Sequence, residues 1–254
     1  MHSATSMGSD QRTTSLILPG AVESLVNSLS QVEGVQAITI GGSQAMGTAD
    51  TTSDWDLGVF YQGRPDFGIL SALGTLHSPG SWGRFMNGGA WLVLDGLEVD
   101  VILRDIEVVE TWCSRARQGE YEVDQLLGYL AGFPSYTLMA EIALSKVIFG
   151  SIDIDVSYPE NLQREASTRW AFQRDFSLDY ARMHARRGDH VGTVGNLVRA
   201  SFEEAHRRMC SDKKWVLNEK RLLNLAGLSE ISLPTQSVEN LEDEVSRFSL
   251  VLKT

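Results

Sequence analysis

Residues 41–57 have the sequence GGSQAMGTADTTSDWDL and follow directly on the short, β-branched run 35–40. This pattern predicts a strand that turns at Gly41 and Gly42, where the missing Cβ lets the backbone approach a ligand closely. Ser43 can cap the short helix or loop that follows, with its hydroxyl and amide facing a phosphate, because N–H groups gather at a helix start. By itself, a Gly-Gly-Ser triplet is more often a tight surface turn.

Two acidic residues follow this turn, at the start of a second predicted strand at 55–61. Asp54 and Asp56 stand two residues apart, so both carboxylates are expected on the same face of a sheet. Neighbouring carboxylates repel each other unless a cation lies between them. Magnesium suits such a pair, because it binds carboxylate oxygens, waters and substrate phosphates together. The alternative is an exposed strand end with solvated acids.

A third carboxylate occurs within the apolar run 97–103. Alternation along this predicted strand places its Leu and Val side chains on one face and Glu98, Asp100 and Ile102 on the other. An aspartate in the middle of such a strand is costly unless it is paired or metal-bound. We therefore expect Asp100 beside the strand of Asp54 and Asp56, where it completes a cluster of three carboxylates. Glu98, nearer the strand start, is expected to be solvated.

The composition excludes several classes of protein. The 254 residues include 22 Lys and Arg against 33 Asp and Glu, which gives a net charge of -11. This balance disfavours nucleic acid as a partner, since nucleic-acid binding requires basic surface, but it suits a small cationic substrate. No apolar run approaches the roughly 20 residues of a membrane helix. The two cysteines cannot form a disulfide framework, so a cytoplasmic protein is expected.

The element pattern predicts an α/β (α+β) protein with two domains after a flexible tail at 1–18. An α/β domain at 19–156 would have a small mixed sheet flanked by helices, and Ser157-Tyr158-Pro159 would begin a helical bundle at 157–254. The predicted strands are 35–40, 55–61, 90–94 and 97–103. The predicted helices are 21–33, 108–117, 123–130, 137–149, 161–187, 191–210, 218–225 and 238–252.

The pattern GGSxAxGTxxxxSDxDL, followed by a strand-borne aspartate, resembles the DNA polymerase β-like nucleotidyltransferase superfamily. Within it, small bacterial enzymes that modify antibiotics of the aminoglycoside or lincosamide type look most similar. The resemblance covers residues 35–104 well. It continues more weakly through the helical region, where residues 218–223, NEKRLL, are the most suggestive.

This resemblance implies magnesium-dependent transfer of a nucleoside monophosphate from an NTP, with ATP the expected donor, to a hydroxyl of a small molecule. Gly42 and Ser43 would hold the β- and γ-phosphates. Asp54 and Asp56 would bind two magnesium ions, while Asp100 would share the catalytic ion and help to deprotonate the acceptor. Two metal ions about 3.5–4 Å apart can stabilise both the attacking and the leaving oxygen.

Two residues outside the sheet also have implied roles. Glu141 lies in a predicted apolar helix, so it either reaches solvent or faces the cleft. In some antibiotic nucleotidyltransferases a helical glutamate is the general base, and the resemblance gives that role to Glu141. Lys220 is either a solvated helix residue or a triphosphate contact from the helical domain.

Three functions remain open at this stage. An antibiotic-modifying enzyme, with resistance as its biological role, fits the helical domain, and a polycationic aminoglycoside fits the net charge. A protein adenylyltransferase of the toxin–antitoxin type is a second possibility, although a minimal domain of that kind would end near residue 110. A catalytically silent nucleotide-binding regulator is the third, against which the presence of Asp54, Asp56 and Asp100 argues. Either a monomer or a homodimer is compatible with the sequence.

Overall fold

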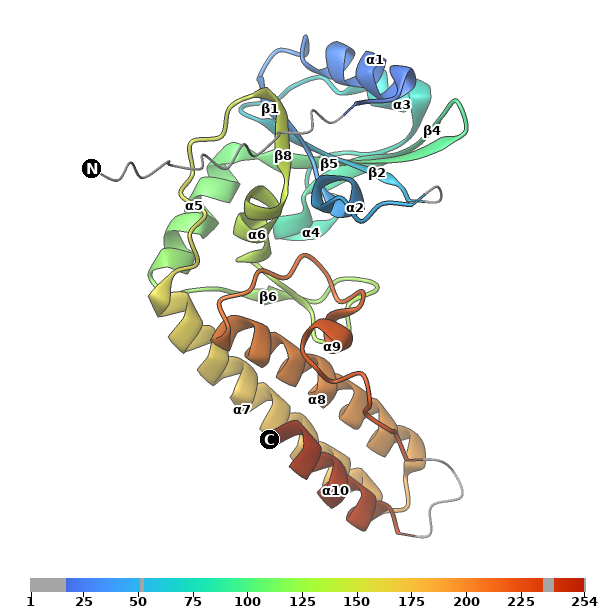
Figure 1. Ribbon diagram of the computed structural model, residues 1–254, viewed down its shortest axis with the longest axis vertical. Coiled ribbons are helices and arrows are strands. Elements are labelled where there is room, and N and C mark those ends of the chain that lie inside the picture. Colours follow the sequence, from blue (N-terminus) through green and yellow to red (C-terminus); the bar gives the residue numbers. More distant parts are fainter. Residues whose placement is uncertain (1–16, 51–52, 235–239, 254) are drawn as a thin grey trace, which may run out of the picture.

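The computed structural model describes residues 17–50, 53–234 and 240–253. An α/β lobe is followed by a helical lobe that extends away from it as an arm (Figure 1). The predicted fold class is confirmed. The predicted tail at 1–18 lies outside the described residues except for its last two. In the part of the chain that the structure describes, every helix is too short or too polar to cross a membrane.

The α/β lobe contains a six-stranded sheet with the strand order β3-β4-β5-β2-β1-β8. Strand β2 runs parallel to β5, whereas the other recorded neighbours in this sheet are antiparallel. The predictions for β1 and β2 are confirmed at both ends, and those for β4 and β5 are each two residues short. The strands are β1 (Val35–Ile40), β2 (Trp55–Tyr61), β3 (Gly74–His77), β4 (Gly88–Leu94), β5 (Leu97–Asp105) and β8 (Lys146–Gly150).

Helices cover both faces of this sheet (Figure 1). Buried side chains of α1 pack with Ile38, Leu57 and Val101 on one face, whereas Ala37 and Phe60 pack on the other face in a cluster with residues of α5 and α6. The remaining elements of this lobe are α1 (Gly20–Leu29), α2 (Gly42–Met46), α3 (Gly68–Leu73), α4 (Gly83–Met86), α5 (Ile106–Arg117), α6 (Thr137–Leu144) and the two-stranded sheet of β6 (Val123–Asp124) and β7 (Phe133–Pro134).

Three predicted helices of this lobe are wrong in part or in whole. The helix predicted at 21–33 ends at Leu29, and residues 30–34 form turns instead. The helix predicted at 137–149 ends at Leu144, because Ser145 is extended and the next five residues pair with β1 as strand β8. The helix predicted at 123–130 is absent, since Val123 and Asp124 pair with β7 instead. Gly132, with φ +107°, has a backbone conformation that favours glycine and lies immediately before β7.

The helical lobe consists of α7 (Glu160–Ala185), α8 (His190–Ser211), α9 (Leu222–Leu225) and α10 (Leu241–Lys253). Helices α7 and α8 form a hairpin, and α10 packs along both. The helix predicted at 218–225 begins only at Leu222, so its first turn is replaced by an irregular segment.

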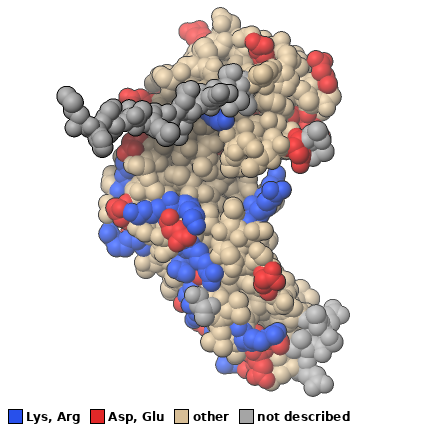
Figure 2. Space-filling view, in the orientation of Figure 1, with Lys and Arg blue, Asp and Glu red and all other residues tan. Residues whose placement is uncertain are grey.

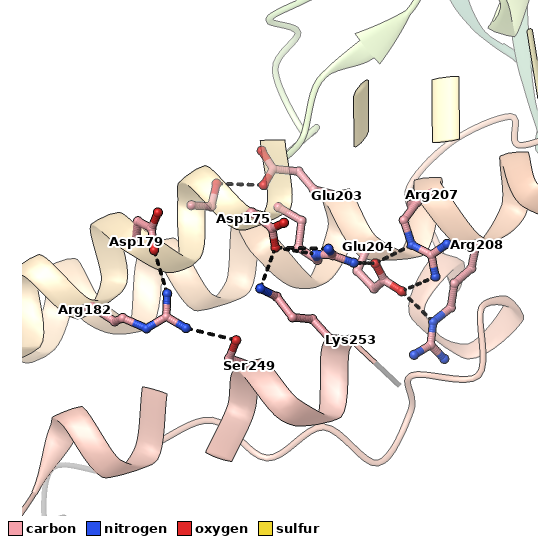
Figure 3. Close-up of polar contacts among 11 residues, drawn as sticks. Asp175, Asp179, Arg182, Glu203, Glu204, Arg207, Arg208, Ser249 and Lys253 are labelled. Atoms are coloured by element: carbon pink, nitrogen blue, oxygen red, sulfur yellow. Dashed lines mark hydrogen bonds and ion pairs between the residues drawn. The ribbon is translucent and has the colours of Figure 1, made fainter. Parts of the chain in front are cut away.

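A network of ion pairs, buried around Glu204 and half-exposed at Asp175 and Lys253, joins these helices (Figure 3). The Glu204 side chain is fully buried, and its oxygens accept hydrogen bonds from Arg174 at 2.6 Å, Arg207 at 2.8 Å and Arg208 at 2.9 Å. Asp175 pairs with Lys253 at 3.0 Å and so links α7 to α10. The arm is therefore held by charge as well as by apolar packing.

The two lobes share part of their apolar core. Trp170 of α7 is fully buried, and its indole N–H donates to the Tyr136 hydroxyl at 2.9 Å. Leu162 of α7 and Cys210 of α8 belong to the same cluster as Trp112 of α5. This core extends across the domain boundary predicted at residue 157. The boundary itself stays a prediction.

Charged side chains are distributed unevenly over the surface (Figure 2). On the face shown, acidic side chains dot the α/β lobe, whereas Lys and Arg side chains gather around the start of α7. At least two arginines in the first turns of α7 already have partners, since Arg164 pairs with Glu165 at 3.0 Å and Arg169 donates to the Tyr121 carbonyl at 2.8 Å.

Candidate active site

The parallel pairing of β2 with β5 places Asp56 directly beside Asp100. Val99, Val101 and Leu103 are buried on the opposite face of the sheet, as the alternation predicts. The sequence predicted that Asp54 and Asp56 lie in one strand. Asp56 does lie in β2, but Asp54 lies one residue before it.

The electrostatics show that these acids form one cluster. The pKa of Asp56 is raised to about 6, mainly by burial and to a smaller extent by the negative charges of Asp100 and Asp54. The positive charge of Lys220 opposes this rise. The pKa of Asp100 is raised by burial and by Asp54, again against Lys220. Three carboxylates and one lysine therefore act on one another at the end of the sheet.

The glycine turn contacts this cluster through its backbone. The Gly41 N–H donates to the Asp56 carbonyl at 2.9 Å. Gly42 has φ +57°, and a Cβ at this position would lie 1.8 Å from Asp56 Oδ2. Only glycine fits here, both for its backbone conformation and for the space available.

The predicted capping role of Ser43 is wrong. Helix α2 begins at Gly42 after the extended residue Gly41, and no side chain caps it. Ser43 therefore lies inside the first turn. The predicted contact of Ser43 with a phosphate stays a prediction.

A pocket of about 140 Å³ opens beside Asp56, between the sheet and α6. Its walls are mainly apolar, and at Gly58, which lines it, a Cβ would lie 2.6 Å from Thr39 Oγ1 and 3.2 Å from the Phe60 ring. Tyr129 also lines it, and burial raises the pKa of this phenol to about 12, so the hydroxyl stays protonated at neutral pH. The lining residues are Thr39, Gly41, Gly42, Asp56, Leu57, Gly58, Phe60, Met86, Ile102, Tyr129, Glu141, Leu144, Ser145, Leu217 and Asn218.

Glu141 faces this pocket, which was one of its two predicted environments, and it is held there by Arg104. Its two oxygens accept from Arg104 Nη2 at 2.6 Å and from Nε at 2.7 Å. The Arg104 side chain is 1% exposed and also donates to the Met86 carbonyl at 2.5 Å. This bidentate pair fixes Glu141 beside the pocket. Its role as a general base stays a prediction.

Lys220 was predicted to lie in a helix, but it lies in the irregular segment before α9. Its backbone N–H donates to Asn218 Oδ1 at 2.9 Å, and the following Arg221 has φ +59°. The Lys220 side chain is exposed, and its charge reaches Asp56 and Asp100 across the junction of the lobes.

The acids fit magnesium by their chemistry, since hard carboxylate oxygens are its preferred protein ligands. Burial and repulsion at Asp56 also leave negative charge for which a cation would compensate. As they stand, however, no three His, Cys, Asp or Glu side chains among the described residues converge on a point that could hold a metal ion.

Several residues at the site were not identified from the sequence. Arg104 lies in β5 and Tyr129 in a segment predicted as helix, and both act through contacts with distant segments. Glu219 and Asn218 were noticed only as part of the suggestive run 218–223. Their side-chain contacts depend on tertiary structure, for which the sequence carries no local signal.

Comparison with known proteins identifies no family. No protein-family model matches the chain, and a search of curated proteins finds no match. Among solved structures, the chain is similar to a nucleotidyltransferase-like protein from Exiguobacterium sibiricum 255-15, with a TM-score of 0.44 and 13% sequence identity. The similarity covers 92% of this chain and 72% of that chain. It is too remote to assign a family or an activity.

Proposed function

We propose that this chain transfers a nucleoside monophosphate from an NTP, with ATP the expected donor, to a hydroxyl of a small molecule and releases pyrophosphate. The observation that carries the proposal is the adjacency of Asp56 and Asp100 on parallel strands, against a turn in which only Gly42 fits. Lys220 adds a positive charge at the same place.

Each residue of the cluster has a proposed task. Gly42 and Ser43 would bind the β- and γ-phosphates through their backbone, and Lys220 would neutralise phosphate charge. Asp54, Asp56 and Asp100 would hold two magnesium ions. Bound magnesium would supply a lowered pKa for the acceptor hydroxyl and charge stabilisation at the leaving phosphate.

Asp100 is the residue proposed to help remove the acceptor proton. Asp100 lies beside Asp56 on the neighbouring strand, so a hydroxyl bound at this cluster would lie within reach of its carboxylate. Glu141 is a less favourable base in this arrangement, because both of its oxygens already accept from Arg104.

The pocket limits how the acceptor can bind. Drug-sized ligands commonly occupy about 300–1,000 Å³, whereas this pocket holds about 140 Å³. We infer that the reacting group enters the pocket while the rest of the acceptor lies outside it. Aminoglycosides and lincosamides remain the antibiotic candidates, and the net charge of -11 attracts the polycationic ones.

The proposal is tested with the full chain, magnesium and each of the four common NTPs. Aminoglycosides, lincosamides and simple neutral alcohols serve as acceptors, with pyrophosphate release and product mass as readouts. We expect turnover that Asp100→Asn removes and Glu98→Gln preserves, because Glu98 is an exposed acid on the same strand. Equal activity in the two variants would exclude the proposed site.

A further inference from the structure

Glu219 is a buried carboxylate at the junction of the two lobes. Its side chain is 6% exposed, and its oxygens accept from the backbone N–H groups of Leu130 at 2.6 Å and Ala131 at 2.8 Å. The donors belong to the segment between β6 and β7, whereas Glu219 precedes α9. One side chain therefore joins two segments that are 88 and 89 residues apart in the sequence.

The surroundings keep this carboxylate ionised. Burial alone would raise the pKa of Glu219, but His206 and the two backbone N–H groups outweigh burial and lower it. His206 Nε2 lies 3.9 Å from Glu219, which is beyond hydrogen-bonding distance. The ring of His206 stacks on Trp170 at 4.5 Å, so the wall behind Glu219 belongs to the core shared by the lobes.

The residues on either side of Glu219 are both linked to the candidate site, since Asn218 lines the pocket and the charge of Lys220 acts on Asp56 and Asp100. Asn218 lines the pocket together with Tyr129, which directly precedes the clamped segment. The Lys220 N–H is bonded to Asn218 Oδ1. With Asn218 and Glu219 both bonded, the backbone from which Lys220 projects has little freedom to move.

We propose that Glu219 is a positioning residue that holds Lys220 beside Asp56 and Asp100 by clamping residues 218–220 to the backbone at Leu130 and Ala131. The clamp aligns a lysine from the helical lobe with acids from the α/β lobe. Its purpose, to present Lys220 to a triphosphate, rests on the function proposed above.

The test is a double-mutant cycle with inorganic triphosphate as the probe. Its affinity is measured by calorimetry, with magnesium present, for the wild type, Glu219→Ala, Lys220→Ala and the double variant. We expect each single change to weaken binding about tenfold, which is ~1.4 kcal/mol. The double variant should be no weaker than Lys220→Ala alone, because Glu219 acts through Lys220.

Two further variants separate positioning from general stability. Glu219→Gln keeps one acceptor oxygen for the two N–H groups and should weaken binding by an intermediate amount. Glu230→Ala removes an exposed acid later in the same lobe and should change nothing. A Glu219→Ala effect of the same size with and without Lys220 would overturn the proposal, as would no effect at all.

A second readout does not depend on the proposed function. Acetylation of the Lys220 amine by acetic anhydride, followed by mass spectrometry, should be several-fold faster in Glu219→Ala than in the wild type, with Lys214 as the internal reference. Equal rates would refute the positioning role. A wild type that binds neither triphosphate nor any NTP would instead refute the proposed function and leave the acetylation result to decide on Glu219.

Discussion

Asp56→Asn should stabilise the protein while it removes activity. The environment of Asp56 raises its pKa from 3.8 to about 6, and each pKa unit corresponds to 1.36 kcal/mol. A charged Asp56 therefore costs ~3 kcal/mol of folding free energy at neutral pH without divalent cations. Asparagine has nearly the same shape and no charge, so the variant should recover much of this energy.

The pH dependence fixes the sign of this effect. Between pH 3.8 and about 6 the folded state binds more protons at Asp56 than the unfolded state, so stability falls as the pH rises. Below pH 3.8 Asp56 is neutral in both states, and the variant should gain nothing. Its advantage should appear between these two values and reach its full size above about pH 6.

The assay is urea denaturation at pH 7.5 and at pH 3.5, in EDTA, followed by tryptophan fluorescence. Glu98→Gln is the matched control, since this exposed acid should change the free energy of unfolding by less than about 0.5 kcal/mol. Magnesium should stabilise the wild type and not Asp56→Asn. A variant less stable than the wild type at pH 7.5 in EDTA, or equally stabilised at both pH values, would refute the reasoning.

Three other changes test separate features. Gly42→Ala should lose at least about 90% of the turnover while the circular dichroism spectrum is retained, because its Cβ would lie 1.8 Å from Asp56 Oδ2. Glu204→Ala should lower the free energy of unfolding in urea by ~1.5–3 kcal/mol, since the buried Arg174 loses its shorter ion pair and keeps the one with Asp175. Glu141→Gln should lower kcat less than about tenfold and lower the Tm, because its main contact is with Arg104; a far larger fall in kcat would show that Glu141 is the base.

The strands that carry the cluster could be predicted because their signals are local. Residues 35–40 and 55–61 combine β-branched or aromatic side chains with a glycine turn between them, and the structure has both strands at the predicted bounds. Alternation around Asp100 also indicated the buried face correctly. The adjacency of Asp56 and Asp100 was expected from the cost of burying a lone carboxylate, and the register confirms it.

Predictions were wrong where distant partners override local preference. Residues 146–150 continue a helical pattern, but they form β8 because the edge of β1 offers them backbone hydrogen bonds. Lys220 lies outside a helix because the Glu219 side chain is bonded to Leu130 and Ala131. A single sequence does not indicate such long-range partners. The contact of Arg104 with Glu141 is another long-range contact of this kind.

The core shared by the lobes couples the unfolding of one lobe to that of the other. Trp170 fills space between α5, α6 and α8, and removing a buried tryptophan typically costs ~3–5 kcal/mol. The connecting segment is itself held in place, since Trp215 donates to the Val156 carbonyl at 3.2 Å and its ring contacts that of Tyr158, with 4.2 Å between the ring centroids and a tilt of 34°. A protease that cuts the exposed residues near Asp153 should therefore leave two fragments that remain associated and unfold in one transition. The pocket beside Asp56 would then admit ligands by rearrangement of side chains and loops, without separation of the two lobes.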